Sequence, residues 1–394
     1  PATGTDIEVN YNDFRDGSGN TIEVGDGASI RANTGSVSFD RTVYPVPFAA
    51  SEYQVHATAT AVTYLPAGPV QVHIQIADAD YDVSAAGQDT ISTSVLDVKI
   101  LRGSDTTADL MPSTNVNILE TAPDSGIFEY DLQIDSGITL VTAGVTQVQQ
   151  GDIITVTYTD PQDASGKVQT VTDSSSFDLR NGVLQADKSV YLIGSDMILT
   201  LIEPDFDLDN DETESYSLDL IEWDSDAAET TMGAQGISWT VGATTYTSEA
   251  AFDPEPSSFR ETGDSTGIFQ VVIEIPDTLA GNLLDRGEKI DLEYTDEGPA
   301  GADYVGQEDE DIGLTVYTSN FGATIELDQK VYTWTDKVYI TIVAPDHNFD
   351  SGLVDEIGNT ASDPVKVSTR GNELSNYKLV ESGADTGIFI GEVT

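Results

Sequence analysis

The sequence contains no cysteine and only three histidines among its 394 residues. Without cysteine, disulfide bonds, thiolate catalysis and cysteine-ligated zinc or iron–sulfur sites are excluded. His56, His73 and His347 do not share a position in the repeats described below, so a histidine triad or a histidine-rich zinc site has almost no raw material. Paired carboxylates can serve a glycosidase, but such pairs are uninformative in so acidic a chain. We therefore predict that the chain is not an enzyme.

Basic residues are also scarce. The chain has 16 lysines and arginines against 69 aspartates and glutamates, which gives a formal net charge of −53. A charge of this sign repels nucleic acid and anionic lipid, so we expect neither as a partner. The expected partners are cations or basic surfaces.

Long apolar runs are missing as well. No stretch of 18 apolar residues occurs, so we expect no membrane span in this sequence. The chain starts at Pro1 without an initiator methionine or a signal-peptide pattern, and we interpret it as a piece of a longer protein. Hydrophobic residues make up 39 % of it, which is enough to build folded cores, and its length suggests two to four domains.

Four short segments recur in the same order along the chain, which indicates tandem repeats. FDRTVY at 39–44 returns at 186–191 and 327–332, and VQVHIQIADADYD at 70–82 returns at 197–209 and 338–350. ETAPDSGIF at 120–128 returns at 261–269 and 381–389, and GDIITVTYTD at 151–160 matches 287–296 and the opening residues 5–13. The sequence therefore begins in the tail of one unit and ends inside another.

Each unit has the pattern of a β domain. Apolar residues alternate at Val72, Ile74 and Ile76, and no long stretch keeps a helical period. Short strands separated by turns are typical of a two-sheet sandwich of the immunoglobulin-like type. We predict an all-β chain of tandem immunoglobulin-like β-sandwich domains, with the tail of a preceding unit at 1–35, sandwiches at 36–182 and 183–322, and a truncated sandwich at 323–394. Insertions at 48–69 and 226–258 are expected to be loops, which often carry contacts.

An acidic triplet follows the second recurring segment. It comprises Asp78, Asp80 and Asp82 in the first unit, Asp205, Asp207, Asp209 and the nearby Asp211 in the second, and Asp346, Asn348 and Asp350 in the third. In a tight loop, alternate side chains converge on one point, which suits a hard cation that needs six to eight oxygen ligands. The pattern therefore predicts calcium binding by these residues.

These loops are not EF-hands, because the required glycine and the final bidentate glutamate are absent. Any further ligands must come from other loops, and Glu120, Glu261 and Glu381 recur at a matching place. The alternative is a solvated acidic turn that binds nothing specific. Repetition at one location favours a metal, most strongly in the middle copy.

The Gly-Ile-Phe end of the third segment has a structural interpretation. A turn at the glycine would send the following isoleucine and phenylalanine into a core strand. Phe128, Phe269 and Phe389 are the expected core anchors.

The signature Glu-Thr/Ser-x-x-x-Thr/Ser-Gly-Ile-Phe, in long acidic β repeats without cysteine, resembles surface-layer proteins, in particular those of ammonia-oxidising archaea. It lies at Glu120–Phe128, Glu261–Phe269 and Glu381–Phe389, and the repeat frame around it covers nearly the whole chain. Similar units occur in other large archaeal and bacterial surface proteins. The resemblance implies extracellular, immunoglobulin-like domains at the cell surface that self-associate into a two-dimensional lattice. It also implies a porous acidic coat that attracts small cations, ammonium among them.

Three functions compete at this point. The leading hypothesis is a structural subunit of a surface-layer lattice. The alternative is a calcium-stiffened adhesin or stalk protein built from the same repeats. A secreted carbohydrate-active enzyme with accessory sandwiches is the third.

Overall fold

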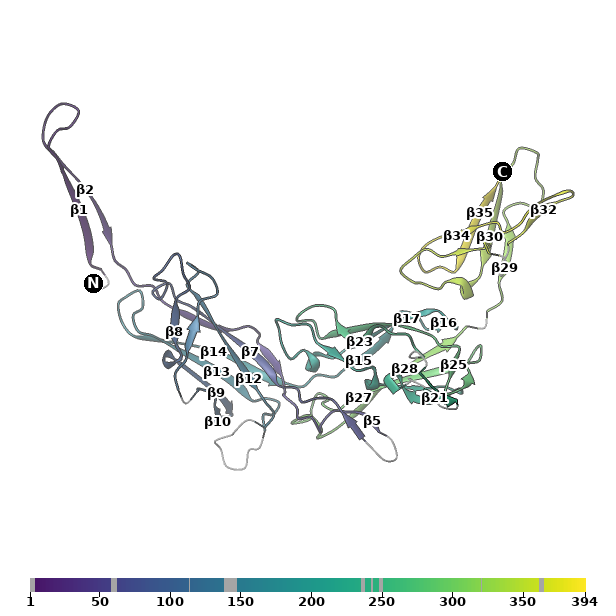
Figure 1. Ribbon diagram of the computed structural model, residues 1–394, viewed down its shortest axis with the longest axis horizontal. Helices are drawn as coiled ribbons and strands as arrows, with labels where there is room; N and C mark the ends of the chain where they lie inside the picture. Colours follow the sequence, from purple (N-terminus) through teal and green to yellow (C-terminus); the bar gives the residue numbers. More distant parts are fainter. Residues whose placement is uncertain are drawn as a thin grey trace.

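The computed structural model describes residues 4–57, 62–112, 114–137, 147–234, 238–241, 244–247, 251–319, 321–360 and 365–394. Strands and five short 3-10 turns are the regular elements of these residues, and none of these residues forms an α-helix. The repeats follow one another along an elongated molecule (Figure 1). We use first, second and third repeat for residues 36–182, 183–322 and 323–394.

A two-stranded hairpin precedes the first repeat. It pairs β1 (Asp6–Asp13) with β2 (Ile22–Ser29) in antiparallel fashion. Its apolar side chains are exposed, Val9 and Tyr11 among them. In Figure 1 the hairpin projects from the end of the molecule opposite the third repeat.

The second repeat shows the topology most completely. Its strands are β15 (Val183–Ala186), β16 (Val190–Tyr191), β17 (Asp196–Ile202), β18 (Ser215–Tyr216), β19 (Ile221–Asp224), β20 (Glu229–Thr231), β23 (Glu255–Glu261), β24 (Ile268–Glu274), β27 (Lys289–Asp296) and β28 (Glu310–Thr318). One sheet has the order β15-β17-β24-β23-β18 and the other β16-β28-β27-β19-β20, with β16 parallel to β28. In immunoglobulin letters, β15-β17-β24-β23 are the A-B-E-D strands, with β18 added at the edge, and the other sheet is A′-G-F-C-C′. Two small hairpins accompany them, β21 (Ser238–Val241) with β22 (Thr244–Thr247), and β25 (Thr278–Leu279) with β26 (Asn282–Leu283).

The first repeat has the same arrangement. Its strands are β3 (Ser36–Phe39), β4 (Val43–Pro45), β7 (Val70–Ala77), β8 (Thr90–Ser92), β9 (Leu96–Arg102), β10 (Asp105–Asp109), β11 (Asn117–Leu119), β12 (Ile127–Ile134), β13 (Ile153–Asp160) and β14 (Gln169–Asp178). The sheet order β10-β9-β13-β14-β4 repeats that of the second repeat, and β12-β7-β3 faces it, with the pair β11-β8 alongside. The predicted all-β class with tandem immunoglobulin-like sandwiches is therefore confirmed.

The third repeat contributes one five-stranded sheet and a hairpin. Its strands are β29 (Thr324–Leu327), β30 (Val338–Val343), β31 (Glu356–Ile357), β32 (Val367–Thr369), β33 (Asn372–Leu374), β34 (Leu379–Glu381) and β35 (Ile388–Val393). The sheet order β29-β30-β35-β34-β31 matches the A-B-E-D sheet of the second repeat.

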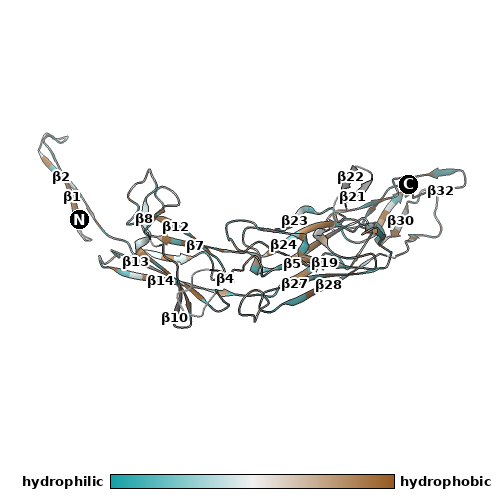
Figure 2. Ribbon diagram, turned by 60° about the horizontal axis from the view of Figure 1, so that its bottom comes forward, coloured by the Kyte–Doolittle hydropathy of each residue, from teal (hydrophilic) through white to brown (hydrophobic). Residues whose placement is uncertain are grey.

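Alternating burial builds the cores. In β7, Val70, Val72, Ile74 and Ile76 are buried while the intervening side chains are not, as the sequence pattern predicts. The expected anchors Phe128, Phe269 and Phe389 are all fully buried. One continuous hydrophobic cluster runs through the first and second repeats, and the third has a cluster of its own. Figure 2 shows the apolar residues along the paired strands of the sandwiches.

The glycine of the Gly-Ile-Phe motif is required by the backbone. Gly126, Gly267 and Gly387 have φ angles of 61°, 58° and 58°, in the left-handed region. A Cβ on Gly267 would also lie 2.8 Å from the Cα of Pro204, on the strand end opposite. The motif thus makes the tight turn that brings β24 against β17.

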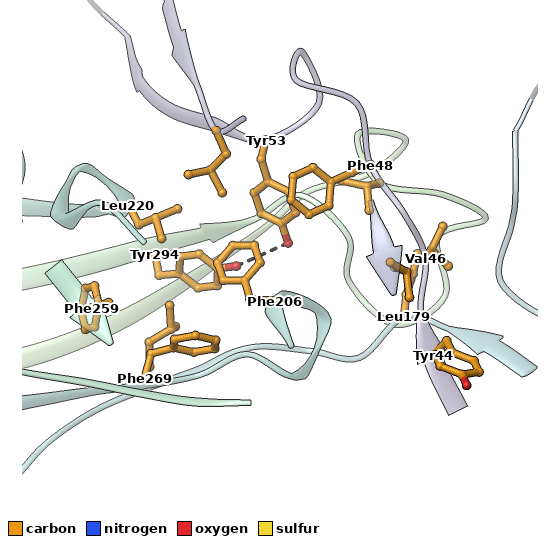
Figure 3. Packing of buried hydrophobic residues seen from close by; sticks show 14 of the residues in the cluster. Tyr44, Val46, Phe48, Tyr53, Leu179, Phe206, Leu220, Phe259, Phe269 and Tyr294 are labelled. Atoms are coloured by element: carbon orange, nitrogen blue, oxygen red, sulfur yellow. Dashed lines mark hydrogen bonds between the residues drawn. The ribbon is translucent and has the colours of Figure 1, made fainter. Parts of the chain in front are cut away.

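The insertion of the first repeat packs against the second repeat. It carries β5 (Gln54–Ala57) and β6 (Val62–Tyr64). The ring of Tyr53 lies 4.9 Å from that of Phe206 and 5.1 Å from that of Phe48, and all three side chains are buried. The Tyr53 hydroxyl donates a hydrogen bond of 3.2 Å to Asp296 Oδ1. It also lies 3.4 Å from the hydroxyl of Tyr294, as the dashed line in Figure 3 shows. The two repeats therefore share a core.

Candidate cation sites

Backbone hydrogen bonds define which residues of the three acidic loops are equivalent. The amide of Asp78 donates to the carbonyl of Gly126, that of Glu203 to Gly267, and that of Ala344 to Gly387. Asp78, Glu203 and Ala344 therefore occupy one position. The recurring segments of the sequence align Asp205 and Asp346 with Asp78, two residues away from this register. Acids that alternate along a chain look the same after a shift of two, which is why the pattern did not reveal the offset.

The acids at this first position, in the first and second repeats, close the end of their sandwiches. Asp78 accepts a 2.5 Å hydrogen bond from the Tyr158 hydroxyl, and Glu203 accepts one of 2.9 Å from Tyr294. Both carboxyls are buried. Burial, helped by the nearby Asp205 and Asp296 in the case of Glu203, raises the pKa of each above its ordinary value. These side chains pack as buried hydrogen-bond acceptors behind the loop.

The acid at the second position of each loop binds the chain segment that leads into the same repeat. Asp80 accepts hydrogen bonds from the backbone and side chain of Asn33 at 2.9 and 3.1 Å. Asp205 accepts from the amide of Arg180 at 2.8 Å, and Asp346 accepts from the hydroxyl of Ser319. The acids at this position therefore fix the linkers.

The third position faces a group of carboxylates. Ligand oxygens of Asp82, Asp89 and Glu120 lie within 4.8 Å of one another, and so do those of Asp207, Glu214 and Glu261. The corresponding residues in the third repeat are Asn348, Asp355 and Glu381. We call these sets cluster one, cluster two and cluster three. The alternating acids of each loop thus point to three different partners instead of converging on one cation.

The same hydrogen bonds build each cluster. Glu214 Oε1 accepts from the amides of Leu208 and Asp209 at 3.0 and 2.7 Å, and Asp89 and Asp355 hold the equivalent amides of their loops. Glu261 Oε1 accepts from the amides of Thr266 and Gly267 at 2.7 and 2.8 Å. One oxygen of each acid therefore shapes the loop and leaves the other directed at the cluster.

The clusters differ in the second oxygen of the glutamate. Glu120 Oε2 accepts from the amide of Asp89 at 3.0 Å, and Glu381 Oε2 from that of Asp355 at 3.2 Å. Among the residues that the structure describes, Glu261 Oε2 has no hydrogen-bond partner, and neither has Glu214 Oε2. Burial, and then the adjacent Glu261 carboxylate, raises the pKa of Glu214 to about 8. Cluster two therefore brings together carboxyl groups that resist being ionised at the same time and whose facing oxygens receive no hydrogen bond from other described residues.

The remaining predicted ligands lie outside the clusters. Asp209 Oδ1 is 3.0 Å from His73 Nε2, and the exposed Asp211 is 4.0 Å from His73 Nδ1. Asp131 contacts Nδ1 at 2.9 Å. Burial by itself would lower the pKa of His73, but these carboxylates raise it to about 9. Asp350 accepts from the amide of Gly352 within its own turn.

Basic residues of one repeat reach the clusters of the next. Arg41 Nη1 donates to the carbonyl of Asp207 at 2.8 Å and lies 3.2 Å from Asp207 Oδ1. Lys188 occupies the same place in its own repeat, and its Nζ lies 4.0 Å from Asp385, which accepts a hydrogen bond from Asn348. Clusters two and three therefore lie at the junctions between repeats.

The sequence contained a signal for the missed cluster residues. In each unit an acid lies seven residues after the third position of the loop: Asp89 after Asp82, Glu214 after Asp207, and Asp355 after Asn348. That spacing is the same in all three units once Asp82, Asp207 and Asn348 are aligned with one another.

The chain also contains one Gly-x-Ser-x-Gly sequence, at 263–267. In esterases such a sequence forms a strand-to-helix elbow. Here it forms the turn between the antiparallel strands β23 and β24, and the Ser265 hydroxyl lies 3.5 Å from Asp207. The local structure is thus a β-turn beside cluster two.

No family model matches the chain, and no curated protein matches it. Among solved structures, it is similar to the Escherichia coli adhesin FdeC, with 11 % identity over 93 % of this chain and 90 % of that chain, and a TM-score of 0.21. It is also similar to the Yersinia pseudotuberculosis adhesin InvE, with 11 % identity over 77 % of this chain and 66 % of that chain, and a TM-score of 0.21. An Escherichia coli alpha-2-macroglobulin matches at 10 % identity, over 91 % of this chain and 29 % of that chain, with a TM-score of 0.18. At these scores the matches carry no conclusion about function.

None of the helical turns in the described part of the chain is long and apolar enough to cross a membrane.

Proposed function

We propose that this chain is a non-catalytic stalk segment of an extracellular surface protein, in which immunoglobulin-like repeats are joined by stiff, charged junctions. The observation that carries the proposal is the insertion of the first repeat, which completes a core shared with the second. Domains of one chain normally meet through modest polar interfaces and move relative to one another. A buried aromatic contact between repeats opposes that motion.

The size of this contact supports a stiff junction. Phe48 and Tyr53 are fully buried against Phe206 of the second repeat. Burying a large apolar side chain contributes roughly 1.5–3 kcal/mol, so two of them supply about 3–6 kcal/mol of coupling. His73 and Arg41 add charged contacts to Asp209 and Asp207 across the same junction. Bending at this point has to break these contacts together.

Calcium is the cation that we propose for the acidic loops of such a stalk. Carboxylate oxygens that lie within 4.8 Å of one another repel without a cation and become ligands with one. A cation bound only to the folded form would raise the free energy of unfolding by RT ln(1 + [L]/Kd), roughly 2.7 kcal/mol at a hundredfold excess over Kd. Small monovalent cations such as ammonium would be attracted by charge alone.

The second candidate is the surface-layer lattice that the sequence suggested. The observation that favours it is the net charge of −53, because a small domain needs a charge of only about 2–8 to stay soluble. In a lattice, this excess would line pores, attract small cations and exclude anions. It requires lateral contacts between copies in addition to the junctions along the chain.

Electron microscopy of the full chain, with calcium and with chelator, tests both candidates. The stalk proposal predicts separate rods in which the angle between the first two repeats has a narrow distribution. A broad distribution of this angle in calcium would contradict it. Two-dimensional sheets would favour the lattice instead.

A further inference from the structure

Cluster two lies beneath the junction of the first two repeats and differs from the other two clusters. Asp207 and Glu261 are only 8 % and 4 % exposed. Glu261 Oε2 and Glu214 Oε2 are buried, point into the cluster and lack a hydrogen-bond partner among the described residues. A buried carboxylate oxygen without a partner is costly, and a bound ion between two of them would remove that cost.

Arg41 does not satisfy these oxygens. Its Nη1 contacts Asp207, and its Nε lies 3.5 Å from Asp40 of its own repeat. Its Nη2 is buried and makes no hydrogen bond within the described residues. A guanidinium selected to fill the cluster would use the fork of Nη1 and Nη2 on the two glutamates. Arg41 therefore leaves the facing oxygens of the two glutamates without a donor.

The charges define the ligand. When all three carboxylates are ionised, they and the one guanidinium leave two negative charges at the cluster, which a divalent cation balances. Oxygen ligands from three separate loop positions suit a hard cation, and calcium tolerates irregular geometry with water completing its shell. The third repeat points the same way, because Asn348 places a buried, unpartnered Oδ1 at the position of Asp207.

We propose that Asp207, Glu214 and Glu261 form a divalent cation site, with calcium as the preferred ion, and that it is the tightest such site in the chain. The inference rests on the proposed stalk function, since it names the cation of the stalk's junction. Cluster one ranks below it because both oxygens of Glu120 are already hydrogen-bonded. Cluster three ranks lowest because Asn348 replaces one carboxylate.

The experiment is a calorimetric titration of the full chain, first stripped with chelator, with calcium chloride and separately with magnesium chloride. Glu214→Gln and Glu261→Gln are the test variants. Each keeps the Oε1 acceptor that holds the loop and replaces only the oxygen that faces the cluster with an amide. Asp211→Asn is the matched control, because this acid lies on the same loop, is exposed and is outside the cluster.

We expect both glutamine variants to weaken the tightest calcium site at least tenfold, and the Asp211→Asn variant to change it less than twofold. Arg41→Gln should tighten the site, because a positive charge beside Asp207 is removed. The inference is overturned if the wild type binds neither ion, or if the glutamine variants bind as the wild type does. It is also overturned if calcium binds only after Arg41 is replaced, since the guanidinium would then be the natural occupant.

Melting curves show whether each variant is folded, so that loss of binding is not confused with loss of folding. If Glu261→Gln fails to fold, the Glu214→Gln variant still decides, because its loop contacts are independent of the Gly-Ile-Phe turn. If the glutamine variants lose calcium binding but still form straight rods, both the cation site and the stalk are supported, independently of each other. Flexible rods with calcium still bound would refute the stalk and leave the site intact.

Discussion

Replacing Tyr53 with alanine should uncouple the first repeat from the second. The side chain is fully buried, and its ring packs against Phe48 and Phe206. Truncating a buried aromatic to alanine costs about 3–5 kcal/mol, from lost burial and from the cavity left behind. Asp296 keeps its hydrogen bonds from Gly182 and Gly298, so no carboxylate is left unpartnered and the cost is one of packing.

Two spectroscopic probes separate the repeats. Trp223 is buried in the second repeat, and the sequence of the first contains no tryptophan. Trp334 of the third repeat is fully exposed already, so its emission should change little on unfolding. In urea, tryptophan fluorescence therefore follows the second repeat, and far-ultraviolet circular dichroism follows the whole chain. The wild type should show both repeats unfolding together, and Tyr53→Ala should shift the fluorescence transition to lower urea and away from the circular dichroism transition.

Two further variants control this reasoning. Tyr53→Phe removes only the hydroxyl, and should cost about 1 kcal/mol. Tyr64→Ala removes an exposed tyrosine from the same insertion, and should change stability by less than about 0.5 kcal/mol. If Tyr53→Ala unfolds within about 1 kcal/mol of the wild type with its transitions unchanged, the insertion does not couple the repeats.

Three other predictions follow from single positions. Glu203→Gln should stabilise the chain above pH 4.5 and not at pH 4, because burial raises the pKa of Glu203 well above 4.5. Each unit of that shift costs the wild type about 1.4 kcal/mol of stability as the pH rises. A melting difference between the two proteins that is flat from pH 4 to 8 would refute this. The pKa of His73 is raised from 6.5 to about 9, so its contribution to the free energy of unfolding should be complete below pH 6.5 and lost as the pH rises through 9. After allowance for screening by solvent, the free energies of unfolding of wild type and His73→Gln, measured by melting, should differ by about 1–2 kcal/mol at pH 6 and converge at pH 10. Gly267→Ala should cost more than about 2 kcal/mol, because the left-handed φ and the contact with Pro204 both oppose a Cβ, and a melting point equal to the wild type would show that the turn adapts.

Much of the fold was available from local sequence. Alternation in segments such as 70–76 predicts strands because side chains of a strand point to opposite faces in turn. The recurring Gly-Ile-Phe ends predicted the buried anchors at Phe128, Phe269 and Phe389, since a turn glycine and a core aromatic are both local requirements. Repetition of these features in one order was sufficient to predict tandem sandwiches.

The tertiary structure decided which carboxylates meet. The sequence placed Asp205, Asp207 and Asp209 together, but the loop sends Asp205 to the linker and Asp209 to His73, and only Asp207 faces Glu214 and Glu261. Likewise, the insertion at 48–69 reads as an extended loop of the first repeat, yet it packs into the second. Both outcomes depend on strand pairing and on contacts between residues far apart in the chain. Composition and spacing specify which groups are available, whereas the path of the backbone determines which of them lie within reach of one ion.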